Sequence, residues 1–111
     1  MRLNPQPFES MESGQKTIEL RLYDEKRKSI RVGDEIEFIN VSDERRRLVR
    51  TVLALHVFPS FEQLYAKLPL LKCGYTPNDV ATASYTDMES YYTLEEQNRC
   101  GVVGIELKIK A

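Results

Sequence analysis

Tryptophan is absent from the 111 residues, histidine occurs once and cysteine only twice. Cys73 and Cys100 match no zinc or redox spacing, and one histidine without a paired cysteine cannot form a zinc site. We therefore expect no metal and no cofactor. No apolar run approaches the roughly 18–20 residues that span a bilayer, and the first residues lack the apolar core of a secretory signal. These absences predict reduced thiols and a cytoplasmic protein.

A large net charge is also missing. Lys and Arg number 16 against 17 Asp and Glu, a net charge of −1, which argues against a protein that coats nucleic acid through bulk charge. Basic residues nevertheless gather at two places, Lys26-Arg27-Lys28 with Arg31 and Arg45-Arg46-Arg47 with Arg50. Acidic residues are interleaved with both clusters, and solvated loops are their plainest interpretation.

The length fits one domain over residues 1–111, without repeats or linkers. Residues 17–22 alternate apolar and polar side chains, which predicts a half-buried strand. Similar patterns predict strands at 35–41, 48–58 and 102–109, a hairpin loop at 42–45, an irregular segment at 69–83, and helices at 5–13, 61–68, 85–92 and 93–99. Short antiparallel strands hide their edges by curling. We therefore predict an α+β protein, a small, mainly antiparallel β-barrel whose short helices cap one opening.

The most informative segment is Gly14-Gln15-Lys16-Thr17-Ile18-Glu19-Leu20-Arg21. Gly14 is expected to end a helix, so that Lys16 leaves a tight turn, and alternation places Glu19 and Arg21 on one strand face. An ammonium, a carboxylate and a guanidinium brought together bind an anion or a polar base edge and shift one another's pKa. Periodicity alone favours a strand that carries an exposed ion pair of little energetic value.

This segment resembles the Gly-x-Lys-x-x-Glu-x-Arg signature of ASCH domains, small β-barrels of the PUA-like superfamily. The similarity extends to Val32-Gly33-Asp34-Glu35 and, near the end of the chain, to Tyr91-Tyr92-Thr93-Leu94 and Gly101-Val102-Val103-Gly104. The resemblance implies a PUA-like barrel, a cleft where Lys16, Glu19 and Arg21 converge, and binding of RNA or a modified nucleoside. Tyr23, two residues after the end of the signature, joins the candidate ligand-binding residues.

Some small bacterial members of the family are amidohydrolases that deacetylate N4-acetylcytidine with a Lys, a Thr and a Glu. In this chain Lys16 stands at the Lys position, Glu19 occupies the Thr position, and Glu89 is a loose candidate for the third residue. Without the family's threonine, Glu19 would activate a water as general base while Lys16 polarises the carbonyl. Thr17 is the nearest hydroxyl. Amide hydrolysis on an N4-acylated cytidine is thus the alternative function.

Other residues extend the binding interpretation. Arg45, Arg46 and Arg47 are candidates to attract a nucleic-acid backbone. Tyr91 and Tyr92 could stack a base or simply pack their helix on the barrel, as could Tyr85. His56 and Cys100 are expected to be structural or inert. A third possibility is a domain that binds an unrelated small ligand or a protein.

Overall fold

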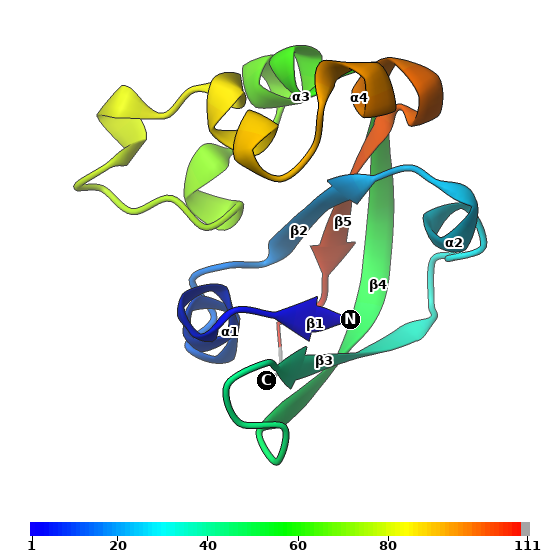
Figure 1. Ribbon diagram of the computed structural model, residues 1–111. Helices are drawn as coiled ribbons and strands as arrows, with labels where there is room; N and C mark the ends of the chain where they lie inside the picture. Colours follow the sequence, from blue (N-terminus) through cyan, green and yellow to red (C-terminus); the bar gives the residue numbers. More distant parts are fainter. Residues whose placement is uncertain (110–111) are drawn as a thin grey trace.

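The computed structural model describes residues 1–109 and contains one curled sheet with short helices around it (Figure 1). Its five strands are β1 (Arg2–Leu3), β2 (Ile18–Leu22), β3 (Glu35–Asn40), β4 (Arg47–Phe58) and β5 (Val102–Leu107). They lie in the order β1-β3-β4-β5-β2. Only the β1–β3 pair is parallel; the other three pairs are antiparallel. The sheet forms a half-barrel, a PUA-like α+β fold, as predicted.

The α-helices are α1 (Pro5–Glu12), α2 (Glu25–Lys28), α3 (Phe61–Lys67) and α4 (Leu94–Cys100). Three short 3-10 helices, η1 (Leu70–Lys72), η2 (Val80–Thr82) and η3 (Tyr85–Ser90), fill the segment between α3 and α4. Local chemistry sets the helix starts. Pro5 begins α1, the Ser60 hydroxyl caps α3, and Thr93 forms a reciprocal capping box with Glu96 at α4.

The first core lies on the inner face of the half-barrel. It joins residues from β1, α1, β3, β4 and β5, namely Leu3, Phe8, Met11, Phe38, Val52, Val103, Ile105 and Leu107. Helix α1 packs into this face through Phe8 and Met11, which are almost completely buried. β1, β3, β4 and β5 thereby bury apolar side chains against a common interior.

The second core lies on the opposite face of β2. It contains Ile18, Leu20 and Leu22 of β2, Phe61 and Leu64 of α3, Cys73 and Val102. The helices of residues 61–100 therefore pack on the outer face of β2 and β5. Figure 1 shows this layer above β2.

Several boundaries also differ from the sequence predictions. β2 was expected to be half-buried, but its inner face is covered too, because Glu19 points into the half-barrel. β5 was expected to continue to Ile109 with one buried face. It ends at Leu107, both of its faces are buried, and Ile109 is exposed. Residues 26–28, interpreted as a solvated loop, form α2, and residues 85–90 form a 3-10 helix instead of an α-helix.

Candidate functional site

A tight turn places Lys16 at the start of β2. Gly14 ends α1 with φ of +88°, a conformation that favours glycine. The amide of Lys16 then donates to the Ser10 carbonyl at 3.0 Å, and the amide of Thr17 donates to the Lys72 carbonyl at 2.9 Å. The turn is therefore held from both sides, by α1 and by η1.

The carboxylate of Glu19 is enclosed by two cations. Its Oε1 lies 2.7 Å from Nζ of Lys16, and its Oε2 lies 2.8 Å from Nη2 and 2.9 Å from Nε of Arg21. The Glu19 side chain is 4% exposed and that of Lys16 10%. Burial by itself raises the pKa of Glu19, but the charges and hydrogen bonds of Lys16 and Arg21 outweigh it and hold this pKa below its ordinary value. We call these three residues the charged triad.

The triad lies at the open edge of the half-barrel. Glu19 is opposite Ile105 and Arg21 opposite Val103 in the β2–β5 register, so both polar side chains share the inner face with the first core. Nη2 of Arg21 also donates to the carbonyl of Arg2 in β1 at 2.9 Å. β1 and β2 are the two ends of the strand order, and this side chain bridges them.

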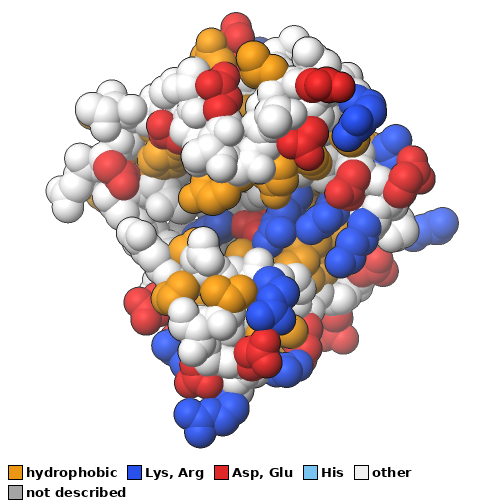
Figure 2. Space-filling model, viewed as in Figure 1, with side chains coloured by type: hydrophobic (Ala, Val, Ile, Leu, Met, Phe, Trp, Pro, Cys, Tyr) orange, Lys and Arg blue, Asp and Glu red, His pale blue; other side chains and the backbone are white. Residues whose placement is uncertain are grey.

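The face that carries the triad is hollowed. Figure 2 shows a hollow between the helical layer above and β1 with α1 below, and blue and red side chains gather in its floor, continuing from β2 toward α2. Charged side chains thus replace the backbone pairing that would close a complete barrel. We call this feature the charged hollow.

Two residues that the sequence did not single out for the site, Cys73 and Gly74, lie beside the triad. Gly74 packs on the stem of Lys16, so that a Cβ there would lie 3.6 Å from its Cδ. Burial raises the pKa of the nearby Cys73 thiol to about 11, with Lys16 and Glu19 acting on it as neighbouring charges. A thiol with so high a pKa is a poor nucleophile. No periodicity in the sequence points to Cys73 or Gly74, because both come from the segment without regular strands or α-helices.

The three tyrosine candidates differ in how far they are buried. Tyr92 is half-buried, stacks on Phe61 with ring centroids 6.0 Å apart, and packs on the second core. The pKa of Tyr92 is raised above its ordinary value, and burial is the largest cause. The nearby positive charges of Arg21 and Arg27 lower this pKa and offset part of the effect. Tyr91 is 67% exposed and its ring centroid lies 6.5 Å from that of Tyr92. Tyr23 is half-buried, and Nζ of Lys28 lies over its ring, 5.8 Å from the ring centroid.

Glu89 is separate from the triad. It lies on η3 with an exposed side chain, and among the described residues it makes no ion pair with Lys16 or any other cation. Glu89 therefore does not join Lys16 and Glu19, and the three residues expected for amide hydrolysis do not meet in this structure.

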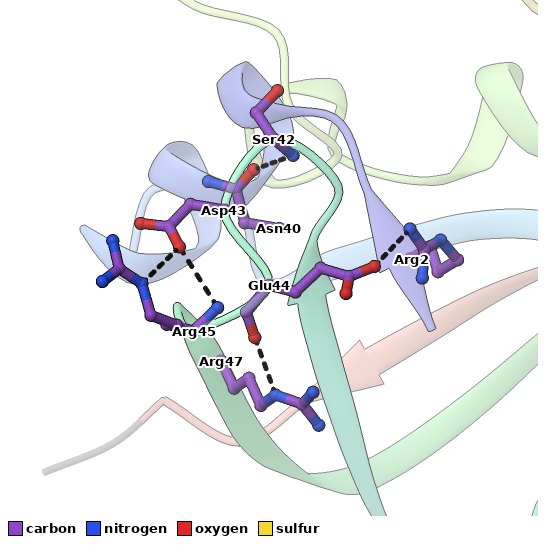
Figure 3. A network of polar contacts seen from close by, with 7 residues as sticks. All are labelled: Arg2, Asn40, Ser42, Asp43, Glu44, Arg45 and Arg47. Carbon is purple, nitrogen blue, oxygen red and sulfur yellow. Dashed lines mark hydrogen bonds and ion pairs between the residues drawn. The ribbon is translucent and has the colours of Figure 1, made fainter.

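The basic cluster of residues 45–47 lies on the β3–β4 hairpin and is largely paired with acids. Arg46 reaches Glu12 of α1 at 2.7 Å, and Arg47 reaches Glu37 at 2.9 Å. Arg45 contacts Asp43 at 3.2 Å but is 92% exposed. Figure 3 shows Asp43 in contact with Arg45 in the loop, and the Glu44 carbonyl accepting a hydrogen bond from Nε of Arg47 at the start of β4.

Two cavities flank residues 14–17 without including the whole triad. One of about 260 Å³ is lined by Lys16, Thr17, Arg50 and Lys108 among others, and one of about 440 Å³ by Thr17, Leu71 and Pro77 among others. Neither is lined by Glu19 or Arg21. Over residues 1–109, no helix is long and apolar enough to cross a membrane, and no group of three His, Cys, Asp or Glu side chains is arranged to hold a metal ion.

The fold is that of a small PUA-like domain. The sequence model of the ASCH domain matches residues 1–110, and the chain therefore belongs to the ASCH domain family, which is linked to RNA binding. No curated protein matches the chain.

Two solved structures are similar over nearly the whole chain. The crystal structure of the hypothetical protein PH0355 has a TM-score of 0.76 and 29% identity, covering 97% of this chain and 94% of that one. The solution structure of protein PF0455 from Pyrococcus furiosus has a TM-score of 0.67 and 29% identity, covering 97% and 96%.

Proposed function

We propose that the protein binds RNA or a modified nucleoside in the charged hollow, with Lys16, Glu19 and Arg21 contacting the ligand. The observation that carries this proposal is the charge of the triad. Two cations surround one carboxylate at positions that are nearly buried. Charge that is removed from water without full compensation is costly. A phosphate entering the hollow would balance the excess positive charge, and a polar base edge would accept hydrogen bonds from the same cations.

The remaining candidates take supporting roles in this proposal. Tyr91, with its exposed ring beside Tyr92, would stack a base, since stacking needs an accessible aromatic face. Tyr23 and Tyr92 would border the hollow. Arg45, the most exposed of the hairpin arginines, would attract a backbone phosphate, whereas Arg46 and Arg47 are held by carboxylates of α1 and β3.

Amide hydrolysis receives less support from the same geometry. Both oxygens of Glu19 are occupied by cations, and this lowers the basicity that a general base needs. The exposed position of Glu89 on η3 leaves the third role unfilled. An uncharged small ligand or an apolar protein segment also fits poorly, because ionic side chains form the floor of the hollow (Figure 2).

The proposal is tested with Lys16→Met, which keeps most of the apolar stem and removes the ammonium. Binding of a fluorescent mixed-sequence single-stranded RNA is measured by anisotropy, and binding of free and acetylated cytidine by calorimetry. We expect affinity to fall at least about tenfold, or about 1.4 kcal/mol. The matched control is Lys67→Met, at an exposed position at the end of α3, which should bind as the wild type does.

Folding of each variant is checked by circular dichroism, since Lys16 is itself nearly buried. A folded Lys16→Met protein with wild-type affinity for RNA and for both nucleosides would show that the charged hollow is not the binding site. Release of cytidine from N4-acetylcytidine by the wild type, and its loss in Lys16→Met, would instead establish the hydrolase.

A further inference from the structure

We propose that Arg27, together with Arg21, forms a phosphate subsite at the α2 end of the charged hollow. The ligand would then be a nucleoside that carries a phosphate on its ribose, either as a terminal monoester or within an RNA backbone. This inference rests on the proposed function and narrows its ligand class.

Arg27 is fixed by its own helix. Asp24 caps α2, accepting a hydrogen bond from the Arg27 amide at 3.0 Å through Oδ1 and binding Nη1 of the same residue at 3.1 Å through Oδ2. The Arg27 side chain is only 16% exposed. It is therefore an anchored group, although the sequence suggests a solvated loop for the basic residues 26–28.

One donor of this anchored guanidinium has no acceptor. Nε of Arg27 is buried and without a hydrogen-bond partner, the single such side-chain atom within residues 1–109. Buried polar atoms are nearly always paired, so that an exception calls for an explanation. The side-on edge of a guanidinium, formed by Nε and Nη2, matches two oxygens of a phosphate. Asp24 binds Nη1, and Nε is the donor of this edge that remains without an acceptor.

The surroundings of Arg27 favour an anion. Arg21 and Arg27 both lower the pKa of the Tyr92 phenol as positive charges, so both guanidinium groups lie in the neighbourhood of this ring. Lys16, Arg21 and Arg27 supply three positive charges, and the carboxylates of Glu19 and Asp24 supply two negative ones, each already engaged in an ion pair. One positive charge is left over. Figure 2 shows basic side chains continuing across the hollow toward α2.

The first experiment uses wild-type protein and inorganic phosphate. The protein is labelled with ¹⁵N, and the Nε–H resonances of its arginines are followed while phosphate replaces chloride at constant ionic strength. Arg27→Lys assigns the Arg27 signal. We expect a saturable shift of the Arg27 and Arg21 resonances, and no saturable shift for the exposed Arg31. An Arg27 resonance that does not respond would overturn the subsite, whatever the variants do.

The second experiment compares Arg27→Lys with the control Arg31→Lys. Both keep the charge, but only the first removes the Nε donor from the hollow. Calorimetry with cytidine, cytidine 5′-monophosphate and a six-residue oligocytidylate should show at least a fivefold loss for the two phosphate-bearing probes in Arg27→Lys. Cytidine binding, and every affinity of Arg31→Lys, should be unchanged.

The two phosphate-bearing probes distinguish the source of the phosphate. Tighter binding of the monophosphate would indicate a terminal monoester, and tighter binding of the oligomer an internal diester; both results support the subsite. A folded Arg27→Lys protein that binds both probes as the wild type does would overturn it. If Lys16→Met still abolished RNA binding, the proposed function would survive that result. Conversely, phosphate binding at Arg27 without any RNA or nucleoside binding would retain the subsite and reject the proposed function.

Discussion

The guanidinium of Arg21 connects the two edge strands of the sheet, with Nη2 donating to the Arg2 carbonyl at 2.9 Å. β1 and β2 stand at opposite ends of the strand order, so that this contact spans the gap left by the half-barrel. The same guanidinium binds the buried carboxylate of Glu19 through Nε at 2.9 Å. The Arg21 side chain therefore contacts both the edge strand β1 and the buried carboxylate in the floor of the charged hollow.

Arg21→Ala should consequently destabilise the protein. Glu19 would keep Lys16 but lose its second cation while remaining buried, and removing one partner of a buried ion pair typically costs about 3–5 kcal/mol. We expect a loss of about 3 kcal/mol, because Lys16 still compensates one oxygen. Urea unfolding measures it. Arg31→Ala, at an exposed position, should change the unfolding free energy by less than about 0.5 kcal/mol.

A loss below about 1 kcal/mol for Arg21→Ala would contradict this account. It would mean that Glu19 is reached by water once the guanidinium is gone. In that case Arg21 would contribute mainly to ligand binding, and the contact with Arg2 would be incidental to the stability of the half-barrel.

The triad also predicts how stability depends on pH. Burial raises the pKa of Glu19, but Lys16 and Arg21 outweigh this effect and hold it below its ordinary value of 4.5. A carboxyl whose pKa is lower in the folded state stabilises the protein fully above the unfolded pKa. This stabilisation is lost as the pH falls from 4.5 through the lower, folded value. Urea midpoints between about pH 6 and about pH 3 should therefore decline toward acid.

Glu19→Gln isolates this contribution. The variant is expected to be less stable at neutral pH, because Lys16 and Arg21 lose their shared carboxylate, but its stability should decline less steeply toward acid. Glu62→Gln, an exposed change in the first turn of α3, should keep the wild-type acid slope. Equal slopes for the wild type and Glu19→Gln would show that Glu19 has no lowered pKa in the folded protein.

Alternation and capping residues in the sequence predicted most of the secondary structure, because each of these signals is local. Thr93 and Glu96 indicate the start of α4, and the period of two marks β2 and β3. The strand β1 was missed, since two residues are too short for a period and its pairing with β3 depends on tertiary contact. The placement of the helical layer was also not predictable. Both faces of β2 are buried, and the sequence does not say on which face the helices pack.

The candidate site was predictable in part. A spacing of two residues places Glu19 and Arg21 on one face, and the turn at Gly14 brings Lys16 alongside. Their burial did not follow, because the sequence does not say that this face of β2 points into the half-barrel. Arg27 was overlooked because a run of three basic residues normally indicates a solvated surface, whereas the Asp24 cap anchors this one.

The hairpin arginines give a prediction that separates attraction of RNA from folding. Arg45→Ala should flatten the dependence of log affinity on log salt by about 0.7, the value of one released phosphate contact on a single strand. Arg46 pairs with Glu12 and lies over the Phe8 ring at 5.3 Å. Arg46→Ala should instead lower the unfolding free energy by about 1 kcal/mol and leave the salt slope unchanged. An unchanged slope for Arg45→Ala would exclude this hairpin from the RNA contact.

Gly104 tests the contact between the sheet and the helical layer. A Cβ at this position of β5 would lie 2.6 Å from Cδ1 of Leu68 and 3.2 Å from Cγ2 of Ile18. Gly104→Ala should therefore overpack the second core and cost about 1–3 kcal/mol. Leu68→Ala removes the closest atom, so that a double-mutant cycle measured by urea unfolding should show a favourable coupling of at least about 1 kcal/mol.

The matched control pairs Gly104→Ala with Leu71→Ala. The Leu71 side chain is partly exposed and is not among the atoms nearest to Gly104, so the effects of these two substitutions should be additive.

Overpacking at Gly104 should also affect the charged triad, because the helical layer is connected to the turn that carries Lys16. Leu68 follows α3, and four residues later the Lys72 carbonyl accepts the hydrogen bond from the Thr17 amide that holds the turn before β2. Gly104→Ala should therefore weaken RNA binding as well as stability, and Leu68→Ala should restore both. Restored stability without restored binding would show that the helical layer does not position Lys16.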